Sequence, residues 1–487
     1  MKGALMRVAI AVLAVFCFCL PAAAQTEEQQ RFERQLEQFR LESRLQNEKG
    51  APIGQQVLFQ YGGYATFDYF SFDDRFKDNH GGTESALIGY ARANFYDAQE
   101  FFVRAKAEYR TFNPGDSFNG KGDQWVYPVL EIAYYRFDLK NQLARNEGTL
   151  IDWDFTFKGG RDLVYWANGL VLSQLLDGGV IDVNAGRFTI EGVGGITPGH
   201  TVDFDSSRPY FDNDTHRGFF GGMIQTQFLG QRPFVYGVAE RDYNDDIARL
   251  NVSGAASPIL THFGYNADYI GAGSTGAVSD QLSYALEIVY EGGNNLSNSF
   301  KVSGGSLVGV PQTRDNIHAY AGDLRIDYAV LDPYRTRLSF EALTSSGDSD
   351  RLVTNNTFGG NKPHTPDLAF NTLGIVNTGL SFSPGISNIT LFRMGASTFP
   401  APQASALRRL QVGADFFVYL KSDARAPIEE PTLNRHFLGV EPDIYLNWRV
   451  TSDVTLVARY GAFLPGQSIL STHAVRQFLF TGVSFAF

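Results

Sequence analysis

Apolar and polar side chains alternate, residue by residue, through most of the chain after Val57. Successive side chains of a β-strand point to opposite faces, so a period of two predicts a strand with one apolar and one polar face. In one example the apolar set is Phe101, Val103, Ala105, Ala107 and Tyr109, and the polar set is Arg104, Lys106, Glu108 and Arg110.

Segments of this kind recur about 18 times, an even number as single-chain bacterial barrels require. The weakest alternation lies at 261–271 and 370–382, which makes sixteen strands the main alternative. We predict strand cores at 57–71, 85–96, 100–112, 128–138, 151–160, 180–190, 217–228, 233–243, 261–271, 281–291, 317–330, 335–345, 370–382, 386–396, 408–421, 437–450, 453–463 and 475–487.

The charged faces indicate what kind of sheet these strands form. A dry core does not hold as many ionised groups as lie between Arg104 and Arg110, whereas a water-filled lumen solvates them at little cost. A bilayer offers no hydrogen-bond partner to free backbone groups, so a sheet inside it must close on itself. The pattern predicts an all-β fold, a closed antiparallel transmembrane β-barrel over residues 55–487.

The last ten residues, Phe478–Phe487, read F-L-F-T-G-V-S-F-A-F. A soluble protein rarely ends on a two-faced strand with a bare terminal aromatic, because such an edge promotes aggregation. The terminal Phe487 resembles the signal that the bacterial barrel-assembly machinery reads. The strand is therefore expected to close the barrel, with Phe487 as the barrel-assembly signal.

The first 24 residues have the layout of a secretory signal peptide. Lys2 and Arg7 precede an apolar run from Val8 to Leu20, and an A-x-A cleavage site follows at 22–24. A lipoprotein signal at Cys17 or Cys19 is the competing interpretation, but Phe precedes each cysteine where a small residue is expected. Cleavage would remove both cysteines of the chain, and export leads to the cell outer membrane of a Gram-negative bacterium.

Residues 25–50 differ from the rest of the chain in composition. Thr26–Lys49 lacks Gly and Pro, and Phe32, Leu36 and Phe39 lie at the i, i+4, i+7 spacing of one helix face. We expect a short charged periplasmic helix. A short coiled coil that joins protomers into a homo-oligomer is the alternative, although fewer than three clean heptads are visible.

Composition supports a membrane barrel and excludes some functions. The 52 acidic residues outnumber the 41 basic ones, which argues against nonspecific nucleic-acid binding. The chain has 40 Phe, 23 Tyr and 50 Gly, as expected for aromatic girdles and tight turns next to outer-membrane lipid. No catalytic motif with a supporting context occurs, so we expect no enzyme, no cofactor and no metal site.

Basic residues on the predicted lumen face are the candidate functional residues. Arginine keeps its charge and binds carboxylates through a planar fork, so bases lining a pore favour anionic solutes. The alternative is that these bases pair with neighbouring acids and stiffen the wall. The candidate pore-lining residues are Arg104, Lys106, Arg110, Arg161, Arg187, Arg325, Arg337, Arg409, Arg449 and Arg459.

Short motifs in two regions resemble the alginate-export family of outer-membrane barrels. The first region contains Gly160-Arg161-Asp162, Asn168-Gly169, Asp177-Gly178, Gly186-Arg187 and Arg217–Gly222, and the second contains Leu438–Asp443, Arg459–Gly466 and the closing strand. The resemblance implies an 18-stranded monomeric barrel that passes an acidic polysaccharide through an arginine-rich constriction. Arg161, Arg187 and Arg459 are the positions that match the family-like motifs.

The sequence thus predicts an outer-membrane channel for passive passage of anionic solutes, with export of an acidic exopolysaccharide such as alginate as its specific form. A general or phosphate-type porin is the alternative within transport. An outer-membrane enzyme or an adhesin is the alternative of another class.

Overall fold

The computed structural model describes residues 57–114, 116, 122–149, 151–199, 216–244, 247–250, 258–303, 306–351 and 360–487. The predicted signal peptide at 1–24 and the predicted helix at 25–50 lie outside the described residues. No helix among those described is long and apolar enough to cross a membrane.

The alternating pattern produces strands with one apolar and one charged face. In β3 (Gln99–Phe112) the apolar Phe101 and Val103 are 49% and 41% exposed, whereas the charged Arg104 and Glu108 on the other face are buried. The apolar face therefore points outward, which is the reverse of a soluble protein and suits a wall that contacts lipid.

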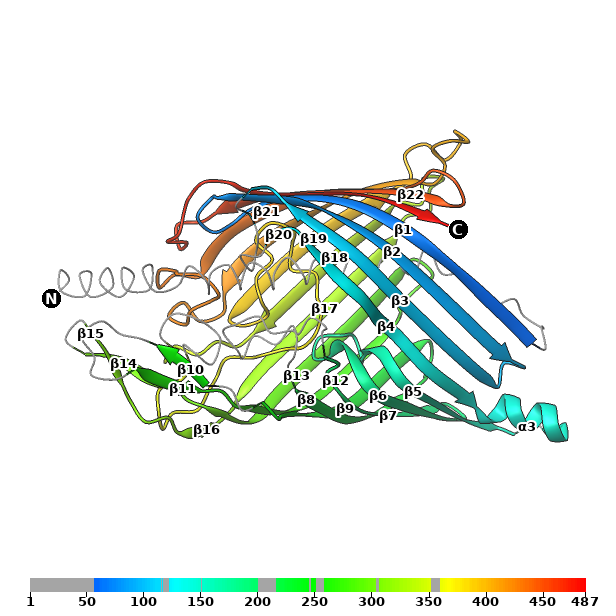
Figure 1. Cartoon of the computed structure of the whole chain (residues 1–487), viewed down its shortest axis with the longest axis horizontal. Helices are drawn as coiled ribbons and strands as arrows, with labels where there is room; N and C mark the ends of the chain where they lie inside the picture. The colour runs from blue at the N-terminus through cyan, green and yellow to red at the C-terminus, as the bar shows by residue number, and fades with distance from the viewer. Residues whose placement is uncertain are drawn as a thin grey trace.

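The strands form one closed antiparallel barrel (Figure 1). Closure is made by β1 and β23, which pair from Tyr64↔Ala486 to Phe72↔Phe478. The sheet has 19 strands, but β16 and β17 follow each other beside β13, so the wall is 18 strands around. Eighteen strands confirms the predicted count, and the alternative of sixteen is wrong.

The strands of the wall have the following bounds. In chain order they are β1 (Val57–Asp73), β2 (Asn79–Phe95), β3 (Gln99–Phe112), β4 (Gln124–Asp138), β5 (Trp153–Tyr165), β6 (Ser173–Ala185), β7 (Phe188–Ile196), β8 (Arg217–Thr226), β9 (Gln231–Asp242), β12 (Tyr265–Ala277), β13 (Leu282–Leu296), β16 (Arg314–Asn316), β17 (Ala319–Ala329), β18 (Arg337–Ser345), β19 (Ile389–Thr398), β20 (Leu410–Lys421), β21 (Phe437–Arg449), β22 (Val454–Pro465) and β23 (Arg476–Ala486).

Among the described residues, two hairpins and a helix lie outside the wall. The hairpins are β10 (Ile247–Leu250) with β11 (Ile259–His262), and β14 (Phe300–Ser303) with β15 (Ser306–Gly309). Helix α3 (Leu139–Glu147) connects β4 to β5; Asp138 caps its first turn by accepting from the Asn141 N–H at 2.9 Å. The sequence pattern did not predict this helix.

The two ends of the barrel differ in the length of their connections. The end that carries the C-terminus has short turns such as 186–187, 278–281 and 450–453, with α3 as its longer connection. The opposite end carries the hairpins β10–β11 and β14–β15 and the long connection 346–388 (Figure 1). Outer-membrane barrels have short periplasmic turns and longer extracellular loops, so the hairpin end is the extracellular one.

Two predicted strands are wrong, and their errors cancel in the count. The segment 180–190 spans the turn between β6 and β7, where Gly186 adopts φ 61° and lets two residues reverse the chain. The segment 370–382 is not a strand, because it forms no ladder with a strand of the wall, and its β-bridge Leu172↔Leu373 joins it to the β5–β6 connection. The predicted 261–271 is displaced, since 259–262 belongs to β11 and the wall strand β12 runs to Ala277.

Loops of the extracellular end fold into the barrel and make an apolar core there. Trp166 and Leu172 from the β5–β6 connection and Leu373 and Phe382 from 346–388 are fully or almost fully buried. They belong to the same cluster as inward residues of the wall such as Phe417. The lumen is therefore partly filled, and this filling narrows the space left for water.

Candidate pore lining

A charged cluster lines the inner face of β2, β3 and β4. Arg104 Nε lies 2.9 Å from Glu131, Lys106 Nζ lies 2.6 Å from Glu108, and Arg110 Nε lies 3.1 Å from Glu84. Arg110 also forms an ion pair with Glu108. The three bases Arg104, Lys106 and Arg110 thus lie together on the inward row, each beside an acid.

A second cluster lines β17, β18 and β19. Arg325 pairs with Asp323 at 2.8 Å and with Glu341 at 3.0 Å, and Arg393 pairs with Glu341 at 2.7 Å. Arg325, Glu341 and Arg393 occupy one hydrogen-bonded row across the three strands. Our candidate residues did not include Arg393, although its alternation with Phe392 and Met394 would have placed it inward.

In three of these pairs the base is more exposed than its acid, whereas in Arg104–Glu131 the acid is the more exposed partner. The Arg325 side chain is 27% exposed and that of Arg393 is 18% exposed, whereas the shared Glu341 is 1% exposed. Lys106 is 11% exposed and its partner Glu108 is 0% exposed. In the pairs of Arg325, Arg393 and Lys106 the acid therefore lies against the wall, and the positive end faces the water.

Arg459 on β22 is held by backbone groups and by an aromatic ring. Its Nη1 donates to the carbonyls of Leu446 and Ala458 at 3.1 Å each, and its guanidinium lies over the Tyr445 ring, 5.3 Å from the centroid. Tyr445 and Arg459 are opposite each other in the β21–β22 register, so the wall itself orients this arginine.

Four other candidates lie at the periplasmic end and are exposed. Arg187 is in the β6–β7 turn over the Phe188 ring, and Arg449 ends β21 and donates to the Ser452 carbonyl at 3.0 Å. Arg337 begins β18, and Arg409 directly precedes β20. These residues belong to the rim of the barrel and not to its interior.

Arg161 lies on the outer face, which corrects its prediction as pore-lining. It shares its side of β5 with the exposed Trp153 and Phe157, and it binds Asp177 of β6 at 2.6 and 2.8 Å. The motif suggested the lumen, but the alternation that starts at Trp153 already places residue 161 outward. The ion pair makes the charge tolerable on this surface.

Three glutamates of the wall bind loops and not bases. Glu441 of β21 accepts the backbone N–H groups of Leu380, Ser381 and Phe382 at 2.7, 2.5 and 2.8 Å. The pairing alternative, in which wall acids such as Glu441 neutralise lumen bases, is therefore wrong for this residue. Hydrogen bonds from N–H groups to a carboxylate are stronger than neutral ones, so Glu441 fixes the inward loop firmly.

Glu287 and Glu291 of β13 repeat this arrangement. Glu287 accepts the Asn168 N–H at 3.1 Å and the Tyr236 hydroxyl at 2.5 Å, and Glu291 accepts the Asn371 N–H at 2.8 Å. Both inward segments, 166–172 and 369–382, are therefore attached to the wall by buried carboxylates. Sequence alone did not reveal these acceptors, because their partners are distant backbone groups.

The terminal Phe487 lies at the seam of the barrel. Its N–H donates to the Gly63 carbonyl at 2.9 Å, and its carbonyl accepts from the Gly63 N–H at 3.1 Å. Its ring stacks on Phe485 with 6.4 Å between centroids and remains exposed on the outer surface. Among the described residues, no group of three or more His, Cys, Asp or Glu side chains is placed to hold a metal ion.

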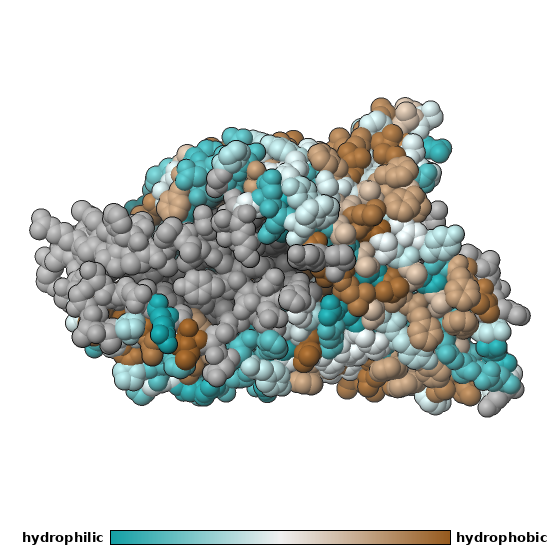
Figure 2. All heavy atoms as spheres, in the orientation of Figure 1, coloured by the Kyte–Doolittle hydropathy of each residue, from teal (hydrophilic) through white to brown (hydrophobic). Residues whose placement is uncertain are grey.

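Apolar side chains gather on the half of the visible wall nearer the C-terminus, and polar ones dominate the extracellular half (Figure 2). A closed sheet with such an apolar outer belt is the only strand arrangement that satisfies its backbone in a bilayer. The chain is an outer-membrane β-barrel.

Comparison with known structures supports this fold. The barrel is similar to the Pseudomonas aeruginosa outer membrane protein OpdK, with a TM-score of 0.52 at 10% identity over 88% of this chain and 98% of that one. It is equally similar to Acinetobacter baumannii OccAB2, with a TM-score of 0.52 at 11% identity over 88% and 98%. For Pseudomonas aeruginosa OccK11 (OpdR) the TM-score is 0.51 at 9% identity over 88% and 95%.

At such low identity the likeness shows a shared fold alone. No family model matches the sequence, and no curated protein sequence matches it. None of the three structures is described as an alginate exporter, so they support an outer-membrane barrel but not the alginate-export family in particular.

Proposed function

We propose that this barrel is a passive channel for small anionic solutes and has no enzymatic activity. The observation that carries the proposal is the layering of the wall pairs, in which Arg325, Arg393 and Lys106 reach the lumen and their acids lie behind them. An anion in the lumen meets positive charge first, while the acids weaken its binding enough for release.

The rim supplies further positive charge at the periplasmic end, from Arg337, Arg409 and Arg449. The loops held by Glu287, Glu291 and Glu441 narrow the lumen beside the deeper bases. A solute therefore passes a narrowed, positively lined stretch before it reaches a positive exit.

Single-channel current in a planar bilayer tests the proposal. The full-chain barrel, with Arg325→Gln/Arg393→Gln and the rim control Arg187→Gln, would be measured under a KCl gradient. One unit charge at 4 Å in water is worth about 1 kcal/mol, a factor of about five. We expect anion-selective current that falls about fivefold or more in selectivity in the double variant and is unchanged in the control.

Other results would reassign the barrel. Unselective current that the double variant leaves unchanged would make it a general porin. Absence of current from a folded barrel would show that the inward loops plug it and would favour an adhesin. Block by oligomannuronate, lost in the double variant, would identify an acidic polysaccharide such as alginate as the solute.

We also propose that Phe487 acts as the barrel-assembly signal and that residues 26–49 form a charged periplasmic helix, with a coiled coil that joins protomers as the alternative. Deletion of Phe487 should lower the amount of folded barrel in the outer membrane, measured by heat-modifiable electrophoretic mobility. Cross-linking of the full chain and of a 26–49 deletion distinguishes the two: an unchanged pattern supports the single helix, and conversion of an oligomer to a monomer supports the coiled coil.

A further inference from the structure

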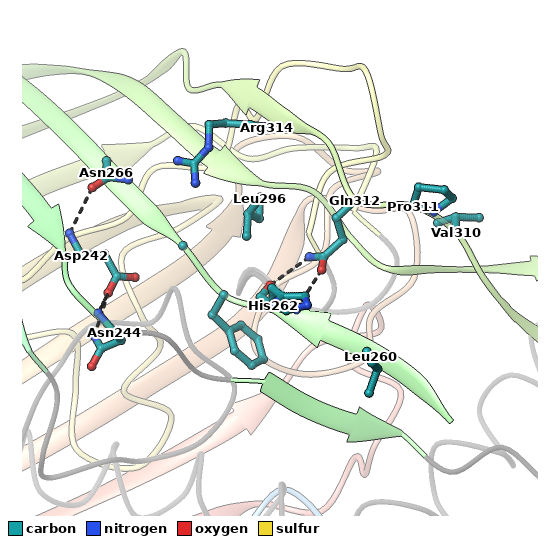
Figure 3. A pocket seen from close by; sticks show the side chains of 12 residues that line it. Asp242, Asn244, Leu260, His262, Asn266, Leu296, Val310, Pro311, Gln312 and Arg314 are labelled. Carbon is teal, nitrogen blue, oxygen red and sulfur yellow. Dashed lines mark hydrogen bonds between the residues drawn. The ribbon is translucent and has the colours of Figure 1, made fainter. Parts of the chain in front are cut away.

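A pocket on the outer surface of the barrel has no role in the channel. Its volume is about 540 Å³, and it lies where the ends of β9, β12 and β13 meet β11 and the start of β16 (Figure 3). Its lining includes the exposed Arg314 and His262, the amides of Asn266 and Gln312, and the apolar Leu260 and Leu296. A cation, amides and apolar side chains in one pocket suit an amphipathic anion.

The pocket lies on the extracellular side of the upper limit of the apolar belt. Ile270, Tyr290 and Tyr320 are opposite one another on three neighbouring strands and are all exposed on the outer face. Tyrosines mark the level of the lipid headgroups in membrane barrels. Tyr290 also hydrogen-bonds to His318 at 2.6 Å, as expected where the wall leaves the hydrocarbon.

Polar rows replace the apolar belt on the extracellular side of these tyrosines. The next outward positions include Asn266 and Asn294, which are opposite each other, and then Leu296 and Arg314, which are also opposite each other. Arg314 is six strand positions beyond Tyr290 on the same face, about 20 Å along a strand and less in height because the strands are tilted. A bound headgroup must therefore extend well above the acyl chains, as a sugar does.

Arg314 is the group of the pocket that can hold an anion. Arg314 Nη1 donates to Asn294 Oδ1 at 2.6 Å, a neutral acceptor, so its charge is not cancelled by that partner. The carboxylate in the lining, Asp242, is engaged by the Asn244 N–H at 2.9 Å, the Asn244 side-chain amide at 2.7 Å and the Tyr265 N–H at 3.2 Å. Gln312 holds the His262 backbone at 2.8 and 2.9 Å and thereby fixes the pocket wall (Figure 3).

We propose that this pocket binds the phosphorylated sugar headgroup of a glycolipid in the outer leaflet. Arg314 pairs with a phosphate, the Asn266 and Asn294 amides hydrogen-bond the sugar, and the acyl chains lie against Ile270 and its neighbours below. Guanidinium groups bind phosphate through two parallel hydrogen bonds, which an amide cannot replace. The site is independent of the proposed channel.

The test is lipid retention on the purified full-chain barrel, measured by native mass spectrometry in detergent. The probes are bisphosphorylated lipid A, dephosphorylated lipid A, phosphatidylglycerol and inorganic phosphate as competitor. The variants are Arg314→Gln, Arg314→Lys, and Arg187→Gln as a matched exposed arginine at the other end of the barrel. Heat-modifiable mobility establishes that each variant is folded.

We expect the wild type to retain bisphosphorylated lipid A at least about fivefold better than the dephosphorylated form. Arg314→Gln should lose that preference, while Arg314→Lys keeps part of it and Arg187→Gln keeps all of it. Equal retention by Arg314→Gln overturns the proposal. So does full displacement by inorganic phosphate, which indicates a free-anion site, or equal retention of phosphatidylglycerol, which indicates no sugar recognition.

Discussion

Glu441 and Glu341 are both buried glutamates on the inward face of the wall, yet they do different things. Glu441 accepts three backbone N–H groups of an inward loop, at Leu380, Ser381 and Phe382. Glu341 lies between two arginines, Arg325 and Arg393. The first kind of acid shapes the lumen, and the second sets the charge that the lumen presents.

The partner decides which role an acid takes. Glu287, Glu291 and Glu441 stand where segments of another loop reach the wall, and peptide N–H groups bring hydrogen bonds without an opposite charge. Glu341 lies between inward bases of the neighbouring strands, and these bases supply both hydrogen bonds and an opposite charge. The same alternation of sequence thus produces an anchor in one place and a counter-charge in another.

Glu441→Gln should produce the largest effect. The amide is neutral, so the charge that strengthens three hydrogen bonds is lost, and one of the two accepting oxygens becomes an NH₂ group that faces N–H donors of the loop. Hydrogen bonds to charged groups contribute about 1.5–3 kcal/mol each, so we expect the inward loop to be destabilised by about 2–4 kcal/mol. Faster proteolytic cleavage within 346–388 and a larger, noisier channel current would measure this.

Glu341→Gln is the control for that prediction. It should leave proteolysis of 346–388 unchanged, because Glu341 contacts bases of the wall. Equal cleavage rates in the two variants would show that the two glutamates do not differ in the way proposed.

Asp177→Asn tests whether an ion pair on the outer face contributes differently to stability from the ion pairs of the lumen. The substitution would leave Arg161 facing lipid without a carboxylate partner on Asp177, while its hydrogen bond to the Leu130 carbonyl at 2.9 Å remains. A cation on the lipid face costs up to about 2–4 kcal/mol at the bilayer midplane and less near the interfaces, so we expect about 1–2 kcal/mol. Urea unfolding from vesicles measures it, and the double variant Asp177→Asn/Arg161→Gln should recover most of the loss.

Glu341→Gln should also sharpen the selectivity of the channel. Removing the shared acid leaves Arg325 and Arg393 without that counter-charge, so the lumen becomes more positive by one charge. We expect anion selectivity to rise about fivefold at low salt and to rise less at 1 M KCl because of screening. A reversal potential that does not move would mean that solutes do not pass this row.

The smallest effect is expected at Asp332, in the periplasmic turn between β17 and β18. The Thr336 hydroxyl donates to it at 2.6 Å and the Thr336 N–H at 3.0 Å, and these hydrogen bonds lower the pKa of Asp332 below its usual 3.8. A lowered folded-state pKa adds stability that is present above pH 3.8 and is lost as the pH falls through the lowered value.

Thr336→Val removes one of those donors. The variant should be slightly less stable than the wild type at neutral pH, and the two should converge as Asp332 becomes protonated in both. Unfolding midpoints across pH 2–7 measure this, and a constant difference would exclude a contribution from Asp332. No effect on loop proteolysis is expected, which separates a turn carboxylate from the anchors.

Barrel closure and the facing of most side chains followed from alternation alone, whereas the strand count matched because one merged hairpin and one extra strand cancelled. The reason is local: a period of two fixes which side chains share a face, and a bilayer requires the apolar face to point outward. This logic placed Arg104, Lys106, Arg110 and Arg325 on the inward rows. The same alternation places Arg161 on the outer face, although the motif had suggested that it faces the lumen.

The contents of the lumen were decided by tertiary structure. The segment 370–382 alternates like a strand, but its N–H groups bind Glu291 and Glu441 of the wall and not a neighbouring strand. Such partners are separated by 80 and 61 residues in the chain. The local sequence shows which groups can donate and accept hydrogen bonds. It does not show which donor binds which acceptor, because that depends on how the folded barrel brings loop and wall together.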